Sequence, residues 1–272
     1  MSDDKVISVE YRGRVAVVTI DNAQKLNSLT QQQYYNLAQL MREIATHDEV
    51  FITVLIGKGR YFSAGANVSL ASASPEEPSK RHQYWLSNFA AYNLNITHAF
   101  SSHPKILVVG LNGPVIGLSA AITAYADFIY AAPHTFLLTP FSSLGLVAEG
   151  GSSRALALRL GPNKANEALI MSKRIPANEL KQCGYVTEIF DVGKDEDAKF
   201  KELLLKEVDE RLGEHLIGDS LLGIKKLIRR PELDVMDVQT VRETMAGLER
   251  FVLGSPQEEF RKLASGEKKH KL

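Results

Sequence analysis

Apolar and polar positions follow two different periods along the front of the chain. Runs rich in β-branched residues at 6–12 and 14–20 are separated by Gly13, a pattern that predicts a hairpin. The runs 50–56 and 106–111 are almost wholly apolar, as is typical of strands covered on both faces. Elsewhere, apolar residues recur at helical spacing. We therefore expect strands to alternate with helices in this part of the chain.

Helices are predicted where apolar residues recur every three or four positions. Thr30 and Gln33 have the spacing of a capping box, and Leu29 and Tyr34 that of a hydrophobic staple, which places a helix start at residue 31. The expected helices are 31–47, 81–102, 163–171, 177–183, 195–215, 220–230, 234–253 and 255–264. Two further helices are expected to follow the turns within 112–127 and 141–161. The expected further strands are 127–131, 135–139 and 186–190, and residues 69–80, rich in Ser, Pro and charge, are expected to form a mobile surface loop.

The balance of strands and helices changes near residue 200. Residues 1–200 are expected to form an α/β core that carries the site, and residues 201–272 a helical region with a tail. The chain has 272 residues, a length that one large α/β domain can accommodate.

Charge and cysteine content narrow the class of protein. The 32 Lys and Arg equal the 32 Asp and Glu, so the chain lacks the broad positive field that sequence-independent binding to nucleic acid requires. The single cysteine, Cys183, excludes an intramolecular disulfide and a cysteine-rich metal site. No histidines have the spacing of a metal motif, so no metal is expected. Asn112, Pro114 and Asp127 interrupt the longest apolar stretch, so no membrane span is expected.

Two junctions from strand to helix consist of small residues. Ser63-Ala64-Gly65-Ala66 follows the run 50–56, and Gly117-Leu118-Ser119-Ala120 follows the run 106–111. Helix N-termini expose unpaired N–H groups with partial positive charge, and small residues let a ligand atom come close to them. Two such amides converging from parallel strands would form an oxyanion hole. Neither junction is a phosphate loop or a dinucleotide-binding fingerprint.

The strings GRYFSAGAN, NGPVIGLSAA and LGLVAEGG, in this order, resemble the crotonase, or enoyl-CoA hydratase/isomerase, superfamily, most nearly its fungal peroxisomal 3,2-trans-enoyl-CoA isomerases. The resemblance covers nearly the whole chain. It implies a spiral of ββα units that binds a CoA thioester, with the carbonyl oxygen held by the amides of Ala66 and Leu118. Asn67 stands where the family usually has Asp. The substrate-binding residues that the resemblance implies are Lys25, Leu26, Ser63, Ala64, Gly65, Ala66, Asn67, Val68, Asn93, Gly117 and Leu118.

Acids and bases decide the reaction in such a family, because the fold alone does not. Members that hydrate a double bond resemble one another in two glutamates, and this chain has Ala121 and Pro140 at those positions. Glu149 in VAEGG stands where the isomerases carry their catalytic glutamate, and Asn93 is implied to hold a water or polar group beside it. Burial would raise the pKa of Glu149, while the helix that follows would oppose that rise.

The function predicted is isomerisation of 3-enoyl-CoA to trans-2-enoyl-CoA in fatty acid β-oxidation, with no metal or redox cofactor. Two alternatives stay open: a dienoyl-CoA isomerase, which in relatives draws on further acidic residues, and a non-catalytic acyl-CoA-binding paralogue. His270-Lys271-Leu272 is similar to a peroxisomal address, so we expect a peroxisomal protein that an import receptor binds. The resemblance also implies a homotrimer or homohexamer.

Overall fold

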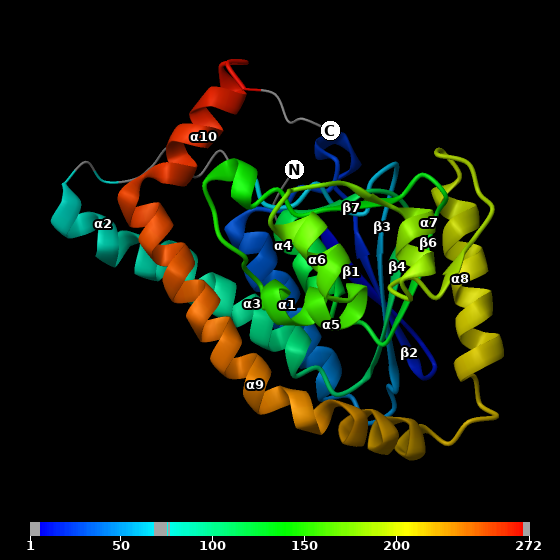
Figure 1. Cartoon of the computed structure of the whole chain (residues 1–272). Helices are drawn as coiled ribbons and strands as arrows, with labels where there is room; N and C mark the ends of the chain where they lie inside the picture. Colours follow the sequence, from blue (N-terminus) through cyan, green and yellow to red (C-terminus); the bar gives the residue numbers. More distant parts are fainter. Residues whose placement is uncertain (1–5, 68–74, 76, 269–272) are drawn as a thin grey trace.

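The computed structural model describes residues 6–67, 75 and 77–268, and its core consists of two β-sheets surrounded by helices (Figure 1). The larger sheet contains, in spatial order, β1 (Ile7–Arg12), β2 (Val15–Ile20), β3 (Ile52–Gly57), β4 (Ile106–Leu111), β6 (Phe128–Ala131) and β9 (Glu188–Ile189). The smaller sheet contains β5 (Val115–Ile116), β7 (Phe136–Leu138) and β8 (Ile175–Pro176). The predicted hairpin of β1 and β2 is confirmed, and every later pair in the larger sheet is parallel.

The helices connect these strands and extend beyond them at the C-terminal end. They are α1 (Gln31–Ala45), α2 (Pro78–Trp85), α3 (Ala91–Ser101), α4 (Gly117–Thr123), α5 (Ser152–Leu160), α6 (Pro162–Leu169), α7 (Ala177–Gln182), α8 (Asp197–Leu212), α9 (Gly218–Leu253) and α10 (Ser255–Ala264). The predicted capping box is present at α1. The hydroxyl of Thr30 accepts the Gln33 N–H at 3.2 Å, and the Gln33 side chain accepts the Thr30 N–H at 2.9 Å.

Helices cover both faces of the larger sheet, which therefore has two apolar cores. One core joins Ala16, Val18 and Ile20 of β2 to α1, α3, α4 and α5, and the other joins Val17 to α8 (Figure 1). Every residue of β3 and β4 is buried. This explains why the two strands are almost wholly apolar rather than alternating.

The long helix α9 corrects one prediction. We expected two helices, 220–230 and 234–253, but α9 continues through Pro231. A proline removes one intrahelical hydrogen bond. Ion pairs on both sides hold the helix in line: Arg229 bonds Asp127 at 3.0 Å, and Glu232 bonds Arg154 of α5 at 2.8 Å.

The helix predicted at 81–102 also differs from the structure. It begins earlier, at Pro78, because proline is favoured at the first position of a helix, so residues 78–80 are helical rather than part of a loop. A π-helical segment, Leu86–Ala90, joins α2 to α3.

Several predictions lie outside the described residues. They are the rest of the predicted loop (69–74 and 76), the implied ligand-binding residue Val68, and the tripeptide His270-Lys271-Leu272. The peroxisomal location and the oligomeric state stay predictions. Among the described residues, no helix is both long enough and apolar enough to span a bilayer.

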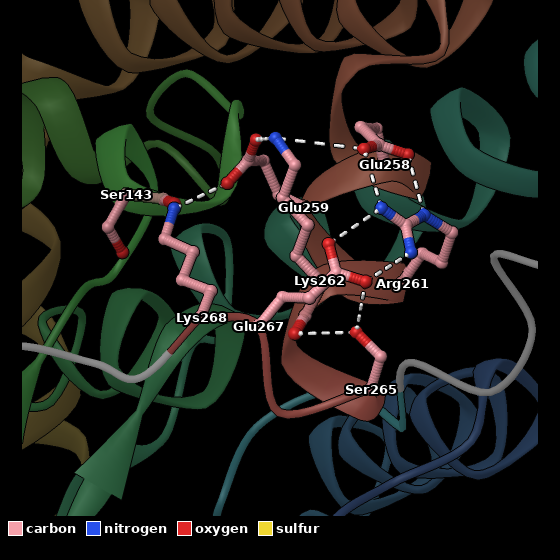
Figure 2. A network of polar contacts seen from close by, with 8 residues as sticks. All are labelled: Ser143, Glu258, Glu259, Arg261, Lys262, Ser265, Glu267 and Lys268. Carbon is pink, nitrogen blue, oxygen red and sulfur yellow. Dashed lines mark hydrogen bonds and ion pairs between the residues drawn. The ribbon is translucent and has the colours of Figure 1, made fainter.

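A network of charged side chains fixes α10 beside the loop that precedes Glu149 (Figure 2). Arg261 pairs with Glu258 at 2.9 Å and with Glu267 at 2.8 Å, and Lys268 bonds the Ser143 carbonyl. Exposed ion pairs of this kind contribute little individually. Arg250 of α9 adds a hydrogen bond of 2.8 Å to the Gly145 carbonyl, so both C-terminal helices contact this loop.

A buried carboxylate ties α9 to the larger sheet. Asp127 accepts the Leu107 N–H at 2.8 Å and pairs with Lys225 at 2.7 Å and Arg229 at 3.0 Å. Burial alone would raise the pKa of Asp127, but Lys225, the Leu107 amide and Arg229 hold it below its ordinary value. The Asp127 and Lys225 side chains are only 15% and 10% exposed, so each needs the other's charge.

We therefore expect Asp127→Asn to lower the free energy of unfolding by about 3 kcal/mol, because it leaves two cations near the core without their counterion. Denaturant unfolding followed by circular dichroism measures this. The matched control is Asp21→Asn, which breaks the exposed pair with Lys58 and is expected to cost less than about 1 kcal/mol. Equal losses in the two variants would contradict this account of Asp127.

Candidate active site

The two small-residue junctions lie side by side at the carboxyl ends of β3 and β4. Ser63 and Val115 form a parallel bridge, in which the Ser63 N–H bonds the Pro114 carbonyl at 3.3 Å and the Ile116 N–H bonds the Ser63 carbonyl at 3.0 Å. Gly65 has a φ of +86°, and a Cβ there would lie 2.8 Å from the Ile116 oxygen. Only glycine therefore fits this approach.

A second parallel bridge, between Leu29 and Ala66, determines the direction of the Ala66 amide, one of the two predicted donors. Leu29 donates its N–H to the Gly65 carbonyl at 2.9 Å and accepts the Asn67 N–H at 2.8 Å. Successive groups of an extended backbone point to opposite sides, so the N–H of Ala66, between them, points away from Leu29. Leu118 is the second residue of α4, where a helix leaves its N–H groups without intrahelical partners.

A cavity of about 220 Å³ opens beside Ala66 and Leu118. Its walls are mostly aromatic and apolar and come from α1, the segment from α2 to α3, α9 and α10. The lining residues are Leu29, Gln31, Tyr34, Ala66, Asn67, Tyr84, Trp85, Asn88, Phe89, Tyr92, Asn93, Ile96, Leu118, Leu146, Glu149, Phe251 and Phe260. Glu149 is the one carboxylate in this lining among the described residues.

Two glycines bring Glu149 close to α4. Gly150 and Gly151 have φ values of +68° and +72°. A Cβ on Gly150 would lie 2.9 Å from both the Ala121 Cβ and the Leu118 side chain, and one on Gly151 would overlap the Tyr125 hydroxyl at 1.8 Å. The chain can therefore pass next to the Leu118 junction only because these positions lack side chains.

The carboxylate of Glu149 is half-buried and has one polar neighbour of known geometry. Asn93 of α3 donates its side-chain N–H to Glu149 Oε2 at 3.0 Å, and Thr244 of α9 bonds Asn93 Oδ1 at 3.4 Å. Burial raises the pKa of Glu149 to about 7, the charge of Glu243 adds to the rise, and the Asn93 bond opposes it. Such a carboxyl can both accept and return a proton near neutral pH.

A chain of buried hydroxyls connects the cavity wall to both junctions. Tyr34 of α1 lies 2.8 Å from Ser119 of α4, which lies 2.8 Å from Ser63. Ser63 donates to the Asn27 carbonyl at 2.8 Å, so Ser119 donates to Ser63 and Tyr34 to Ser119. Ser119 is 1% exposed, so this chain of hydroxyls lies in the protein interior.

The implied site residues divide into two groups. Ala66, Asn67, Asn93, Leu118 and Glu149 line the cavity together. The others lie beside these residues in the chain or in space: Leu26 accepts the Ala64 N–H at 2.8 Å. Lys25 precedes Leu26, Ser63 and Gly65 flank Ala64, and Gly117 is the first residue of α4.

The aromatic wall of the cavity and a second acidic residue, Glu243, were not predicted from the sequence. Trp85 and Phe89 both pack against Phe251, and their ring centroids lie 4.5 Å and 4.6 Å from that of Phe251. Glu243 is 5% exposed and lies on the buried face of α9 with Met236, Thr240 and Gly247. An acidic residue at helical spacing among small and apolar ones was the available signal.

The chain is similar in sequence to known proteins of one family. The model of the enoyl-CoA hydratase/isomerase family matches residues 10–204. The chain is 63% identical to a Delta(3,5)-Delta(2,4)-dienoyl-CoA isomerase of Pyricularia oryzae over 98% of this chain and 99% of that one. It is 33% identical to the 3,2-trans-enoyl-CoA isomerase of Saccharomyces cerevisiae, over 98% of this chain and 96% of that one.

The fold matches solved structures as well. An enoyl-CoA hydratase/isomerase of Pseudoalteromonas atlantica superposes with a TM-score of 0.83 at 25% identity, over 98% of this chain and 100% of that one. The predicted α/β crotonase-type fold is confirmed. The chain belongs to the enoyl-CoA hydratase/isomerase family.

Proposed function

We propose that this protein is an enoyl-CoA isomerase in which Glu149 carries a proton from carbon 2 to carbon 4 of a 3-enoyl-CoA, giving trans-2-enoyl-CoA. The observation that supports it best is the placement of one carboxylate, Glu149, in the same cavity as the Ala66 and Leu118 junctions. The absence of glutamate at positions 121 and 140, where the resemblance places the two glutamates of hydratases, argues against addition of water. Ala121 contacts the Glu149 loop, Pro140 is buried, and neither side chain ionises.

The proposed reaction begins at the thioester carbonyl. The amides of Ala66 and Leu118 donate to its oxygen and stabilise the negative charge that forms when carbon 2 loses a proton. Glu149 takes that proton, the double bond moves to carbons 2 and 3, and the same carboxyl returns the proton to carbon 4. The substrate is neither oxidised nor reduced, so the proposed step calls on no redox cofactor.

The two oxygens of Glu149 have different surroundings in this proposal. Asn93 donates to Oε2, which fixes the carboxyl plane and leaves Oε1 for the proton transfer. The aromatic wall from Trp85 to Phe251 keeps the charge that develops away from water and so strengthens the amide contacts.

A second candidate is the isomerisation of 3,5-dienoyl-CoA to 2,4-dienoyl-CoA. The 63% identity to a protein named for that reaction favours it. The proton then moves from carbon 2 to carbon 6, twice as far along the chain, a distance suited to two acids. Among the described residues Glu149 is the one carboxylate lining the cavity.

The two candidates predict different substrate preferences. With 3-hexenoyl-CoA and 3,5-octadienoyl-CoA assayed side by side, we expect the larger kcat/KM for 3-hexenoyl-CoA, because one carboxylate reaches carbons 2 and 4. Faster turnover of the dienoyl substrate would replace the first candidate with the second. Tight binding of both thioesters without turnover would instead establish a non-catalytic acyl-CoA-binding protein.

Replacing Glu149 by Gln tests the mechanism. We expect kcat to fall by about 10²–10⁴-fold, the usual contribution of a positioned general base, while the affinity for a saturated acyl-CoA stays within about twofold. Glu188→Gln, at an exposed carboxylate on β9, is the matched control and should leave kcat unchanged. An isomerase rate preserved in Glu149→Gln would exclude Glu149 as the base.

The pH dependence follows from the pKa of Glu149. Only the ionised carboxylate can take a proton, so kcat/KM is expected to rise with pH through about 7 and then level off. Initial rates with 3-hexenoyl-CoA between pH 5 and pH 9 measure this. An acid limb centred near pH 4.5, the ordinary pKa of a glutamate, would show that the cavity does not raise the pKa of Glu149.

A further inference from the structure

Glu243 is a buried carboxylate that the proposed reaction does not use directly. It lies on α9 and faces the first turn of α5, where its Oε1 accepts the Ser153 N–H at 2.9 Å and the Ser153 hydroxyl. Gln239, one turn earlier on α9, donates to the same hydroxyl at 2.8 Å. The other carboxylate oxygen of Glu243, Oε2, is buried and has no hydrogen-bond partner within the described part of the chain.

The position of Glu243 matters because α5 begins directly after Glu149. The N-terminus of a helix carries partial positive charge and stabilises a nearby carboxylate. The Ser152 N–H bonds the backbone carbonyl of Glu149 at 3.2 Å, so this helix end and the Glu149 residue are in contact. A glutamate that capped the helix would be held ionised and would be a weak base. Instead of Glu149, it is Glu243 that accepts an N–H group of this helix end, that of Ser153.

The surroundings of the two carboxylates contain few other charges. Asn93 of α3 and Tyr34 of α1 face Glu149, and no Lys or Arg lines the cavity among the described residues. Near Glu243, Tyr125 of the loop after α4 donates to the Gly150 carbonyl at 3.0 Å.

Other charged side chains of α5 and α9 interact with groups other than these two carboxylates. Arg154 of α5 is paired with Glu232. Arg229 is paired with Asp127, and Asp237 acts on Tyr125. The charge of Glu243 raises the pKa of Glu149. Burial raises the pKa of Glu243, and the Ser153 side chain and the amides of residues 151–153 oppose that rise.

We propose that Glu243 is a positioning residue for proton transfer, which occupies the anion-favouring N-terminus of α5 and so keeps Glu149 from becoming a permanently ionised cap. This inference rests on the proposed role of Glu149. It adds a second acidic residue, from a helix far along the chain, that sets how strongly the first one binds its proton.

Glu243→Gln tests this inference because the amide oxygen can still accept from Ser153 while the charge is lost. We expect the acid limb of the kcat/KM profile to move down by about one pH unit, since a nearby like charge is removed. Because the base is then weaker, the plateau rate is expected to fall about threefold. The profiles of the parent and the variant should therefore converge or cross at low pH, whereas a merely structural loss would lower the rate equally at every pH.

Glu249→Gln is the matched control. It removes an exposed carboxylate from the same helix, α9, and leaves the pair between Arg154 and Glu232 intact. Its acid limb should stay within about 0.2 units of the parent's, because exposed charges perturb distant groups little. Glu243→Asp, which keeps the charge, should retain most of the parent's limb and covers the case in which Glu243→Gln fails to fold.

Direct titration separates this inference from the proposed function. In protein labelled with ¹³C at the glutamate carboxyls, the Glu149 signal is assigned by its loss in Glu149→Gln and followed with pH in the absence of substrate. We expect a midpoint near 7 in the parent and a lower one in Glu243→Gln. An unchanged or higher midpoint would overturn the inference, and a lowered midpoint in a protein that isomerises nothing would retain it while rejecting the function.

Discussion

The close approach of two backbones at the carboxyl ends of β3 and β4 is the constraint on which the site depends. Gly65 and Gly113 lie where a Cβ would meet backbone of the opposing loop at under 3.0 Å, and a Cβ on Gly57 would lie 2.7 Å from the Phe62 carbonyl oxygen of its own loop. Asn112 completes the contact by accepting the Gly57 N–H at 3.1 Å and donating to the Gly59 carbonyl at 2.6 Å. Polar side chains thus satisfy the backbone groups that the tight turns leave over.

From this approach the rest of the site follows in order. The bridge between Ser63 and Val115 brings the two junctions together, and the bridge between Leu29 and Ala66 sets the direction of the Ala66 amide. The glycines after Glu149 bring the carboxylate against α4. The C-terminal helices then close the cavity with Phe251 and Phe260. Elements from both the α/β core and the helical region therefore share one site, so a boundary near residue 200 divides the sequence but not the function.

Much of this could be predicted from the sequence because it depends on local chemistry. The capping box of Thr30, the almost wholly apolar β3 and β4, and the small residues at both junctions are signals within a few positions. The continuity of α9 through Pro231 and the burial of Glu243 could not be predicted in this way. Their partners, Arg154 and Ser153, lie 78 and 90 positions away in the sequence, and a local pattern does not specify such pairs.

The fate of one hydrogen tests the central claim most directly. If Glu149 alone carries the proton across one face of the substrate in a cavity that excludes water, deuterium placed on carbon 2 of 3-hexenoyl-CoA will appear in part on carbon 4 of the product, as mass and NMR spectra of early turnover show. A product with no deuterium on carbon 4, all of it lost to solvent from the first turnover, would contradict transfer by a single carboxyl.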